Sequence, residues 1–462
     1  MDFLLWVECG MVEIGLAYGD EILKASIPSE NLKIVERSSY PPLRNWQEDA
    51  GIALDSPIGI EPLEKSVSSG DRIAIIVDDL TRDTPVSLLL QMLLERLKAA
   101  SVDRDHIDIV MATGTHEEPP TEKVKEKIGH KVAERFKVTI HNSLGKENLA
   151  YLGLTSRGTP IWINQVVAEA DFKIGIGGIR PHAEAGFGGG GKIILPGVSA
   201  WESIGSNHFL YAHPKSRFGI LEGNPFRMDI EENATVAGLD FILNVVLNKE
   251  GQMAKVVAGD PIAAHREGVE VVRAICENPI KRKADVLIMS FGPKDQTLWQ
   301  LIGSANTLSM ADQAVKRGGS VILVGSCCEG IYRRFLGIHH LNYEGDQTGV
   351  EDFLQLLSSG AEPHEIYSET LRGNIPYMEL GAKGVVLSSL IRERNIRIVS
   401  RELDPEDVRW LGTLSSDVDE AVNAALEEQG KDSDIIVVDT SALKTSPRMV
   451  PYVSVGCEHS LV

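Results

Sequence analysis

The first half of the chain contains three short, mainly apolar runs that constrain the fold more than any other feature. They cover residues 72–77 (RIAIIV), 107–112 (IDIVMA) and 172–177 (FKIGIG). Runs of this length and composition are typical of strands buried on both faces of a parallel sheet. Residues 86–99 follow the first run and have the apolar spacing of a helix. This order of strand, helix and strand predicts an α/β fold with a parallel sheet.

The second half of the chain repeats this alternation. The expected strands cover residues 284–290, 320–325, 384–388 and 434–439, and the expected helices cover residues 308–316, 350–358 and 417–428. The order predicts a Rossmann-like parallel sheet. A helical stretch ends at Cys276, which places a domain boundary between residues 1–279 and 280–462. We therefore expect an α/β fold of two domains, each built on a mainly parallel sheet flanked by helices, with the active site in the interdomain cleft.

Polar and titratable residues follow each of the three strands in the first half. These residues are Asp79, Thr81 and Arg82 after the first strand, His116 after the second and His182 after the third. Open α/β sheets bind their ligands at the carboxyl ends of parallel strands. One histidine at a strand end is most often structural, but three strand ends that all carry such residues predict a functional site.

A glycine-dense loop surrounds Lys192. Glycines occupy positions 186 and 188–191, His182 lies ten residues before the lysine, and His208 lies sixteen residues after it. Glycine has no Cβ, so the backbone of such a loop can approach a bound group closely and adopt positive φ. Histidine is the side chain whose unperturbed pKa lies closest to neutral pH. The segment therefore predicts a cofactor cradle with acid–base or ligand groups beside it.

Two other interpretations of this loop were weighed. Residues 186–192 satisfy GxxxxGK, the core of a phosphate-binding P-loop. A P-loop requires Ser or Thr after the lysine and a helix that begins there. Here Ile193 follows the lysine, and Pro196 stops any helix within a turn, so we reject a P-loop. A mobile glycine loop with an exposed lysine is the remaining alternative to the cradle.

The other histidines and the cysteines are expected to be structural. His141 and His265 lack the strand-end or glycine-loop context. Five cysteines in a chain of 462 residues do not form a disulfide framework. Cys327 and Cys328 follow an expected strand and are interpreted as buried or loop thiols rather than metal ligands.

Composition argues against several classes of protein. The chain has 66 acidic and 46 basic residues and a formal net charge of −20. This charge argues against binding to nucleic acid or to an anionic membrane surface. No apolar run approaches the length of about 18 residues that a transmembrane helix needs. The first ten residues lack the basic start and small-residue cleavage site of a signal peptide, so we expect a cytoplasmic protein.

The strand ends and the glycine loop together resemble the lactate racemase family. The shared pattern is DDLTR at 78–82, GTH at 114–116, PHx₃GFxGGxK at 181–192 and a histidine sixteen residues after the lysine. The resemblance extends from about Val12 to the 390s, and the combined spacing is highly specific. It implies that the cofactor is a nickel-pincer nucleotide, a mononucleotide derived from nicotinic acid.

The resemblance also implies roles for individual residues in the first domain. Lys192 matches the lysine that tethers the nucleotide through a thioamide, and His208 matches the histidine that coordinates nickel. His116 and His182 match a pair of acid–base histidines. Residues 1–279 are therefore expected to anchor the cofactor and to carry the catalytic groups.

Further residues are implied to bind the substrate or the cofactor. Arg82 matches the arginine that binds the substrate carboxylate, and Gln300 matches a glutamine of the C-terminal domain that faces the site. The residues expected to contact the cofactor are Asp79, Thr81, Arg82, Gly189, Gly190 and Gly191.

The implied activity is a racemase or epimerase that inverts the C2 carbon of a 2-hydroxy acid. Removing hydride from C2, after loss of the hydroxyl proton, gives a flat 2-keto acid that can be refilled from either face, and only a cofactor can accept that hydride. Two bases, one for each face, and a cation for the carboxylate complete the requirement. The implied partners are the small-molecule acid and the proteins that synthesise the cofactor, and the oligomeric state is left open.

One position departs from the family pattern. Three residues after the glutamine, the family has a lysine that also holds the substrate carboxylate, whereas this chain has Gly303. The change removes one charge-assisted hydrogen bond, worth about 1.5–3 kcal/mol, and opens volume. Because Arg82 can still bind the carboxylate through its planar fork, we expect a 2-hydroxy acid larger than lactate.

Two alternatives from other classes were weighed beside the racemase. The first is an NAD-dependent 2-hydroxy acid dehydrogenase, but the second half of the chain lacks a GxGxxG fingerprint. The second is a non-catalytic homologue that binds the pincer nucleotide, and the presence of both His116 and His182 argues against it.

Overall fold

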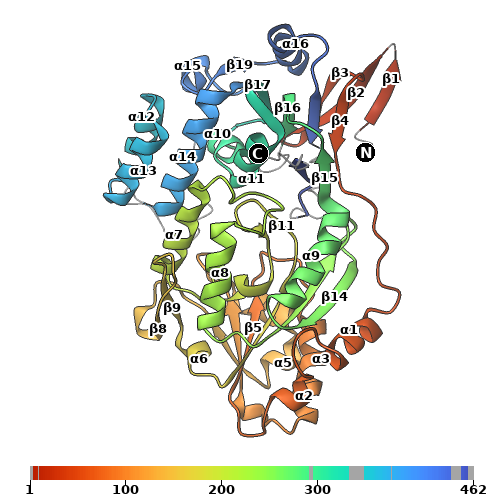
Figure 1. The fold of residues 1–462 in the computed structure, drawn as a ribbon, viewed down its shortest axis with the longest axis vertical. Helices are drawn as coiled ribbons and strands as arrows, with labels where there is room; N and C mark the ends of the chain where they lie inside the picture. The colour runs from red at the N-terminus through yellow and green to blue at the C-terminus, as the bar shows by residue number, and fades with distance from the viewer. Residues whose placement is uncertain are drawn as a thin grey trace, which may run out of the picture.

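Two six-stranded sheets form the framework of the protein (Figure 1). The computed structural model describes residues 4–8, 10–290, 295–331, 348–375, 377–438 and 449–455. In Figure 1 the first sheet lies in the lower half of the picture, and the second lies in the upper half beside the amino-terminal strands. Mainly parallel sheets flanked by helices confirm the predicted α/β fold class.

The first sheet has the strand order β14-β13-β10-β5-β6-β7. Its neighbouring strands are parallel except for β13 and β14, which are antiparallel. The strands are β5 (Ile73–Asp78), β6 (Ile107–Ala112), β7 (Lys137–Ile140), β10 (Phe172–Gly178), β13 (Phe241–Leu247) and β14 (Met253–Gly259). The three strands predicted here are confirmed as β5, β6 and β10. The predicted helix is confirmed as α3 (Val86–Ala99).

The second sheet has the strand order β19-β18-β17-β16-β20-β4, and all its neighbouring strands are parallel. The strands are β4 (Leu32–Val35), β16 (Ala284–Ser290), β17 (Val315–Val324), β18 (Asn395–Val399), β19 (Thr413–Ser415) and β20 (Ile435–Val438). Three of the four strands predicted in this half are confirmed as β16, β17 and β20.

The strand predicted at 384–388 is wrong, because these residues lie inside helix α14 (Met378–Glu393). A short apolar run of this kind fits a buried helix as well as a buried strand. Helix α14 is buried on several sides, with Leu380 and Leu387 both inaccessible to solvent, so its sequence has little amphipathic spacing. The strand that pairs with β17 in this region is instead β18.

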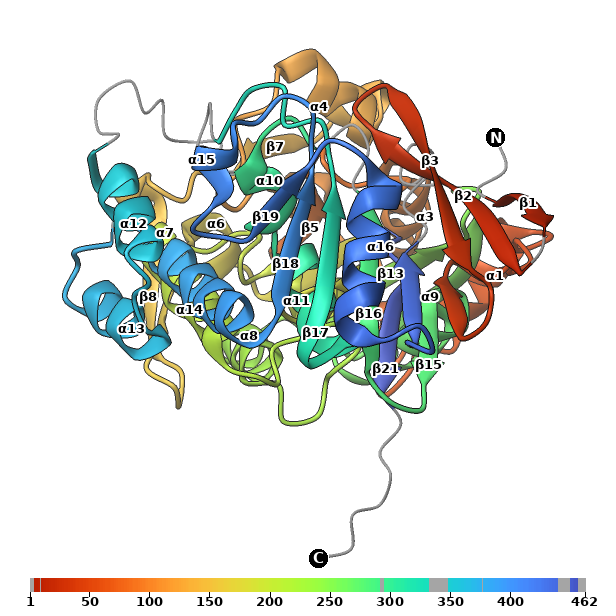
Figure 2. The same ribbon diagram turned by 90° about the horizontal axis from the view of Figure 1, so that it is seen from above.

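The amino-terminal segment belongs with the second sheet rather than with the first. Strands β1 (Leu4–Glu8), β2 (Met11–Tyr18) and β3 (Glu21–Pro28) form an antiparallel sheet. Residues of β2 and β3 share a hydrophobic core with β16, β17 and β20, and β4 pairs with β20. Seen from above, β2 and β3 lie beside helix α16 (Val418–Gln429), which covers the same sheet (Figure 2). This differs from the expectation that residues 1–279 form one domain, because the sequence contains no signal for the long-range pairing of β4.

The remaining elements cover the sheets and connect them. The helices are α1 (Trp46–Asp55), α2 (Leu63–Ser66), α4 (Thr121–Ile128), α5 (His130–Ala133), α6 (Gln165–Ala168), α7 (Trp201–Phe209), α8 (Pro225–Val236), α9 (Ala263–Cys276), α10 (Leu298–Ile302), α11 (Ala305–Ala314), α12 (Thr348–Ser358), α13 (Pro363–Leu371) and α15 (Pro405–Val408). The strand pairs outside the large sheets are β8 (Leu149–Leu154) with β9 (Pro160–Asn164), β11 (Pro181–His182) with β12 (Gly186–Phe187), and β15 (Glu277–Ile280) with β21 (Tyr452–Val455). None of the helices in the described ranges combines the length and apolarity needed to cross a membrane.

Ile14 and Ile22 provide a matched test of the amino-terminal packing. Ile14 on β2 is fully buried, whereas Ile22 on β3 is 38% exposed. We expect Ile14→Ala to lower the free energy of unfolding by about 2–5 kcal/mol, because it leaves a cavity in the core. Ile22→Ala is expected to lower it by less than about 1 kcal/mol. Denaturant unfolding followed by circular dichroism measures both, and equal losses would contradict the packing of β2 against the second sheet.

Candidate active site

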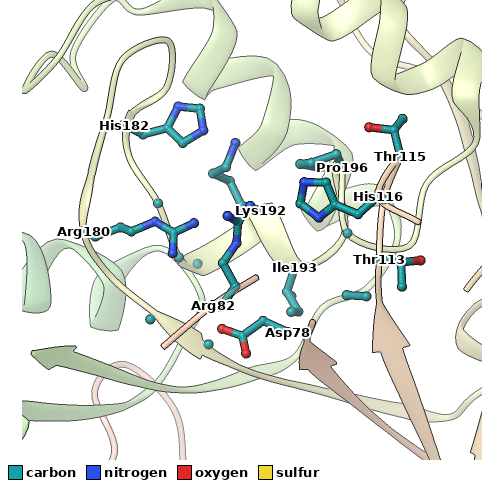
Figure 3. Close-up of a pocket in the computed structure, with 18 of the residues that line it drawn as sticks. Asp78, Arg82, Thr113, Thr115, His116, Arg180, His182, Lys192, Ile193 and Pro196 are labelled. Carbon is teal, nitrogen blue, oxygen red and sulfur yellow. The ribbon is translucent and has the colours of Figure 1, made fainter. Parts of the chain in front are cut away.

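The register of the first sheet brings the three predicted strand ends together. Asp78 at the end of β5 is opposite Ala112 at the end of β6, and Val77 is opposite Ile176 of β10. The polar residues that follow these strands therefore share one edge of the sheet. They line a cavity of about 200 Å³ (Figure 3). Seven predicted site residues line it: Arg82, His116, His182, Gly189, Gly190, Lys192 and His208.

Asp79 holds His116 in one orientation. The Nδ1 atom of His116 lies 2.5 Å from Oδ2 of Asp79, and the hydroxyl of Thr81 donates to Oδ1 of Asp79 at 2.6 Å. Burial alone would raise the pKa of Asp79, but the hydrogen bond with His116 and the charges of His116 and Arg82 lower it to about 2. An ionised carboxylate can only accept, so Nδ1 of His116 carries a proton and Nε2 is left able to accept one.

In the view of Figure 3, His182 and His116 lie on opposite sides of Lys192. It ends the short strand β11, and its Nδ1 accepts from the backbone amides of Glu184 and Ala185, each at 3.3 Å. Burial, and then the positive charges of nearby groups such as Arg180 and Arg82, lowers the pKa of His182 well below its ordinary value. The side chain is therefore neutral at pH 7.

The glycine loop approaches its supports so closely that side chains would not fit. Gly189 has a φ of +78°, and a Cβ there would lie 2.8 Å from Ile179. Gly190 has a φ of +59°, and its amide donates to the side-chain oxygen of Asn244 at 2.9 Å. Both φ values lie in the left-handed region that favours glycine. The loop is thus fixed by packing, which is the opposite of a mobile glycine loop.

A buried arginine that was not predicted from the sequence donates hydrogen bonds to the backbone of the same loop. Arg227 on α8 is inaccessible to solvent, and it donates to the carbonyl oxygens of Ala185 and Phe187. His265 on α9 donates through Nε2 to the carbonyl of Gly188 at 2.8 Å. Both contacts satisfy carbonyl groups that are turned away from the cavity. The expectation that His265 is structural agrees with this contact.

Lys192 presents its amine to the cavity in surroundings that disfavour the charged form. Burial, and then the positive charge of Arg227, lowers the pKa of Lys192 well below its ordinary value. The Nζ atom lies 5.5 Å from the centre of the Phe226 ring. A neutral amine is a nucleophile, whereas an ammonium is not. Lys192 is therefore suited to a covalent bond with an acyl or thioacyl group.

His208 is oriented as a metal ligand requires. It lies in the last turn of α7, where Nδ1 donates to the carbonyl of Ile204 at 2.8 Å. This bond fixes the tautomer and leaves the lone pair of Nε2 free, as in most metal-binding histidines. In the ranges that the structure describes, no group of three or more His, Cys, Asp or Glu side chains is placed to hold a metal. One imidazole with a free Nε2, in the same cavity as the amine of Lys192, fits a pincer nucleotide that is tethered at the lysine and brings further ligands of its own.

Several residues that line the cavity were not assigned a role from the sequence. Arg180 precedes His182 and adds a second guanidinium beside Arg82, and Glu379 reaches the cavity from α14 of the second half of the chain. Asp78 is buried, and its Oδ2 accepts from the hydroxyl of Thr84 at 2.6 Å. Arg180 could have been found from its position at a strand end, but Glu379 lies near the start of α14, whose residues 384–388 were predicted as a strand.

Gln300 and Gly303 do not line the cavity. The side-chain oxygen of Gln300 accepts from the amide of Thr297 at 3.0 Å and so caps helix α10. A Cβ at Gly303 would lie 2.5 Å from the Trp299 ring, so this glycine is required by packing. Thr81 supports Asp79 rather than lining the cavity, and Gly191 packs against Ala234 of α8.

The protonation of His182 gives a direct test of this geometry. Because its pKa is lowered from the ordinary 6.5, the ring is expected to stay neutral as the pH falls through 6.5 and to gain a proton only in more acidic solution. The unfolded chain binds that proton first, so the contribution of His182 to stability is lost as the pH falls below 6.5. Histidine NMR titration, with His182→Asn to assign the signal, measures the pKa. A value of 6.5 or above would contradict the buried position.

Comparisons with known proteins agree with the site. Residues 18–219 match the family model described as the lactate racemase N-terminal domain. The chain is 29% identical over 437 residues to the lactate racemase of Thermoanaerobacterium thermosaccharolyticum, covering 93% of this chain and 97% of that protein. It is also 29% identical over 440 residues to the lactate racemase of Lactiplantibacillus plantarum, covering 93% of this chain and 98% of that protein.

Solved structures lead to the same family. The lactate racemase apoprotein from Thermoanaerobacterium thermosaccharolyticum has a TM-score of 0.75 and 28% sequence identity, covering 96% of this chain and all of that one. A protein from Thermotoga maritima, with a TM-score of 0.60 and 15% identity over 91% of this chain, shares the fold alone. The chain is therefore similar over nearly its whole length to lactate racemases, and residues 18–219 match the model of the lactate racemase N-terminal domain.

Proposed function

We propose that the protein is an isomerase that inverts the C2 carbon of a 2-hydroxy acid with a nickel-pincer nucleotide tethered to Lys192. The observation that carries the proposal is the placement of His116 and His182 on either side of the Lys192 amine, with Arg82 beside them. Its relatives are named lactate racemases, which supports racemisation of a 2-hydroxy acid. The proposed substrate is larger than lactate.

Inversion at C2 requires breaking a C–H bond that is not acidic. When bound, the pincer nucleotide supplies a carbon that accepts this hydrogen with its electron pair and later returns it. The hydroxyl proton leaves at the same stage, so the substrate becomes a flat 2-keto acid. Because a flat 2-keto acid can be reduced again from either face, the substrate would be inverted without net oxidation, and the side chains of the protein would only have to remove and return the hydroxyl proton.

The residues of the chain bind the substrate and move its hydroxyl proton. Arg82 is proposed to hold the carboxylate through two parallel hydrogen bonds. His116 takes or returns the proton through Nε2, because Nδ1 is held by Asp79. His182 does the same for the opposite enantiomer. A proton that arrives at His116 is stabilised by the ionised Asp79, which keeps the pair close to neutral overall.

Two further side chains anchor the cofactor. The neutral amine of Lys192 is proposed to form the thioamide, and Nε2 of His208 to bind nickel. The imidazole of His208 would supply nickel with one nitrogen ligand, a ligand type that suits this metal. Because the cofactor is made elsewhere, the protein depends on the proteins that synthesise it.

The two alternatives from the sequence are less well supported. A buried lysine with a lowered pKa at the centre of the site has no role in an NAD-dependent dehydrogenase. The second half of the chain also lacks the dinucleotide fingerprint. A non-catalytic homologue has no use for the short Asp79–His116 contact, which orients a proton acceptor. Purified protein that contains nickel and isomerises a single enantiomer of a 2-hydroxy acid would separate the racemase from both.

The cofactor assignment can be tested without measuring turnover. Intact mass spectrometry of protein produced with the cofactor-synthesis proteins is expected to show an adduct that Lys192→Ala abolishes. Lys123→Ala, at an exposed lysine on α4, is the control and retains the adduct. His208→Ala is expected to retain the organic adduct but to lose nickel, measured by elemental analysis. An adduct that persists in Lys192→Ala would contradict the tether.

The acid–base assignment predicts the behaviour of two histidine variants. Replacing either His116 or His182 with Asn is expected to lower turnover about 10²–10⁴-fold, because each removes a general acid–base group. The asparagine keeps a polar side chain of similar size. Chiral NMR assays started from each enantiomer in turn measure both directions. A variant that racemises at the rate of the unaltered enzyme in both directions would contradict the use of two bases.

A further inference from the structure

A second cavity opens beside the first. It has a volume of about 350 Å³ and lies between α7 and α14. Thr115, His208 and Glu379 line both cavities. A group that extends from the catalytic cavity past these three residues therefore enters the second cavity directly. Nothing in the proposed mechanism uses this space.

The walls of the second cavity are mainly apolar. Trp201 and Ile204 line it from α7, and Tyr377 and Met378 line it from the start of α14. The rings of Trp201 and Tyr377 meet edge to face, with their centres 5.9 Å apart. Aromatic side chains in this arrangement present both a face and an edge to a third ring, and the thioether of Met378 adapts to an aromatic neighbour.

The charges around the two cavities differ in sign. The guanidinium groups of Arg82 and Arg180 line the first. The residues that line the second, within the described part of the chain, include Glu202 and Glu379 but no lysine or arginine. Each of these glutamates has a cationic partner outside the cavity lining: Lys383 donates to the carboxylate of Glu379 at 2.5 Å, and Lys146 lies 3.7 Å from Glu202. A carboxylate or phosphate is therefore favoured in the first cavity, where two guanidinium groups can bind it.

We propose that the second cavity binds the side chain of the substrate, and that the substrate is a 2-hydroxy acid with an uncharged aromatic side chain. This rests on the proposed function, which places the carboxylate at Arg82 and the hydroxyl between His116 and His182. The aromatic ring then lies between α7 and α14, and Glu379 at the junction rejects substrates that carry a second carboxylate. Specificity thus comes from α14 rather than from Gly303, which is outside the cavity.

Gly205 offers a way to close the second cavity. It lies on α7 within the cavity lining, and a Cβ there would be 3.9 Å from the Cβ and sulfur of Met378, an ordinary contact distance. A small side chain therefore fits, and a large one fills the space from the helix side. Gly51 on α1, where a Cβ meets no atom within 4 Å, is the matched control for placing a bulky residue in a helix.

The test compares 3-phenyllactate with lactate on the nickel-containing holoenzyme. The unaltered protein is expected to prefer 3-phenyllactate by about tenfold or more in kcat/KM, since a filled apolar pocket discriminates on that scale. Gly205→Phe is expected to reduce the ratio of the two kcat/KM values by about tenfold or more, and Gly51→Phe to leave it unchanged. Met378→Trp closes the cavity from α14 and gives the same result if Gly205→Phe does not fold.

A second experiment tests the charge of Glu379, which lies where the two cavities meet. It uses malate, a 2-hydroxy acid that carries a second carboxylate. Glu379→Gln is expected to raise kcat/KM for malate relative to 3-phenyllactate by about tenfold, because it removes a like charge. Lactate preferred over 3-phenyllactate, or a ratio unaffected by both cavity-filling variants, would overturn the proposal.

The binding of 3-phenyllactate separates this proposal from the proposed function. Saturation-transfer NMR on the same preparations is expected to show the phenyl protons in contact with the unaltered protein and not with Gly205→Phe. If the phenyl ring binds in this way but no 2-hydroxy acid is isomerised, the racemase proposal fails and the cavity assignment stands. If lactate is isomerised but the phenyl ring does not bind, the cavity assignment fails and the racemase stands.

Discussion

The glycine loop around Lys192 depends on the buried guanidinium of Arg227. This group satisfies the carbonyl oxygens of Ala185 and Phe187, which face away from solvent. A buried carbonyl without a partner costs about 1–3 kcal/mol, so two would cancel much of the stability of a short loop. Its charge also contributes, after burial, to lowering the pKa of the Lys192 amine. One side chain therefore both fixes the backbone that carries Lys192 and sets the reactivity of that lysine.

Helix α8, which carries Arg227, also contacts α7, the helix on which His208 lies. Asn207, next to His208 on α7, donates to the carboxylate of Asp229 on α8 at 2.9 Å and to the carbonyl of Phe226 at 3.2 Å. The Phe226 ring in turn contacts His208, with ring centres 5.1 Å apart. Because α8 supports both the lysine loop and α7, the distance between the two anchoring groups is set by one rigid element. Such preorganisation is what a tethered, metal-binding cofactor requires.

The sequence allowed the framework of the site to be predicted, because that framework rests on local signals. The strands β5, β6 and β10 are short apolar runs, and the residues directly after them must lie at their carboxyl ends. Arg227 and Asn244 could not be found in this way, because they act through contacts with residues distant in the sequence. Gln300 was expected at the site but caps α10, since the pattern could not reveal the competing local hydrogen bonds of its side chain.

The misassigned segment 384–388 had the largest functional consequence. A strand there would have placed these residues in the second sheet, away from the catalytic edge of the first. As a helix, α14 instead packs against α7 and brings Glu379 to the cavity beside His208. Because α14 is buried on several sides, its sequence is apolar on those sides and lacks the amphipathic spacing by which a surface helix is recognised. The burial that made the helix hard to predict from the sequence is the same burial that gives α14 a fixed position beside the two cavities.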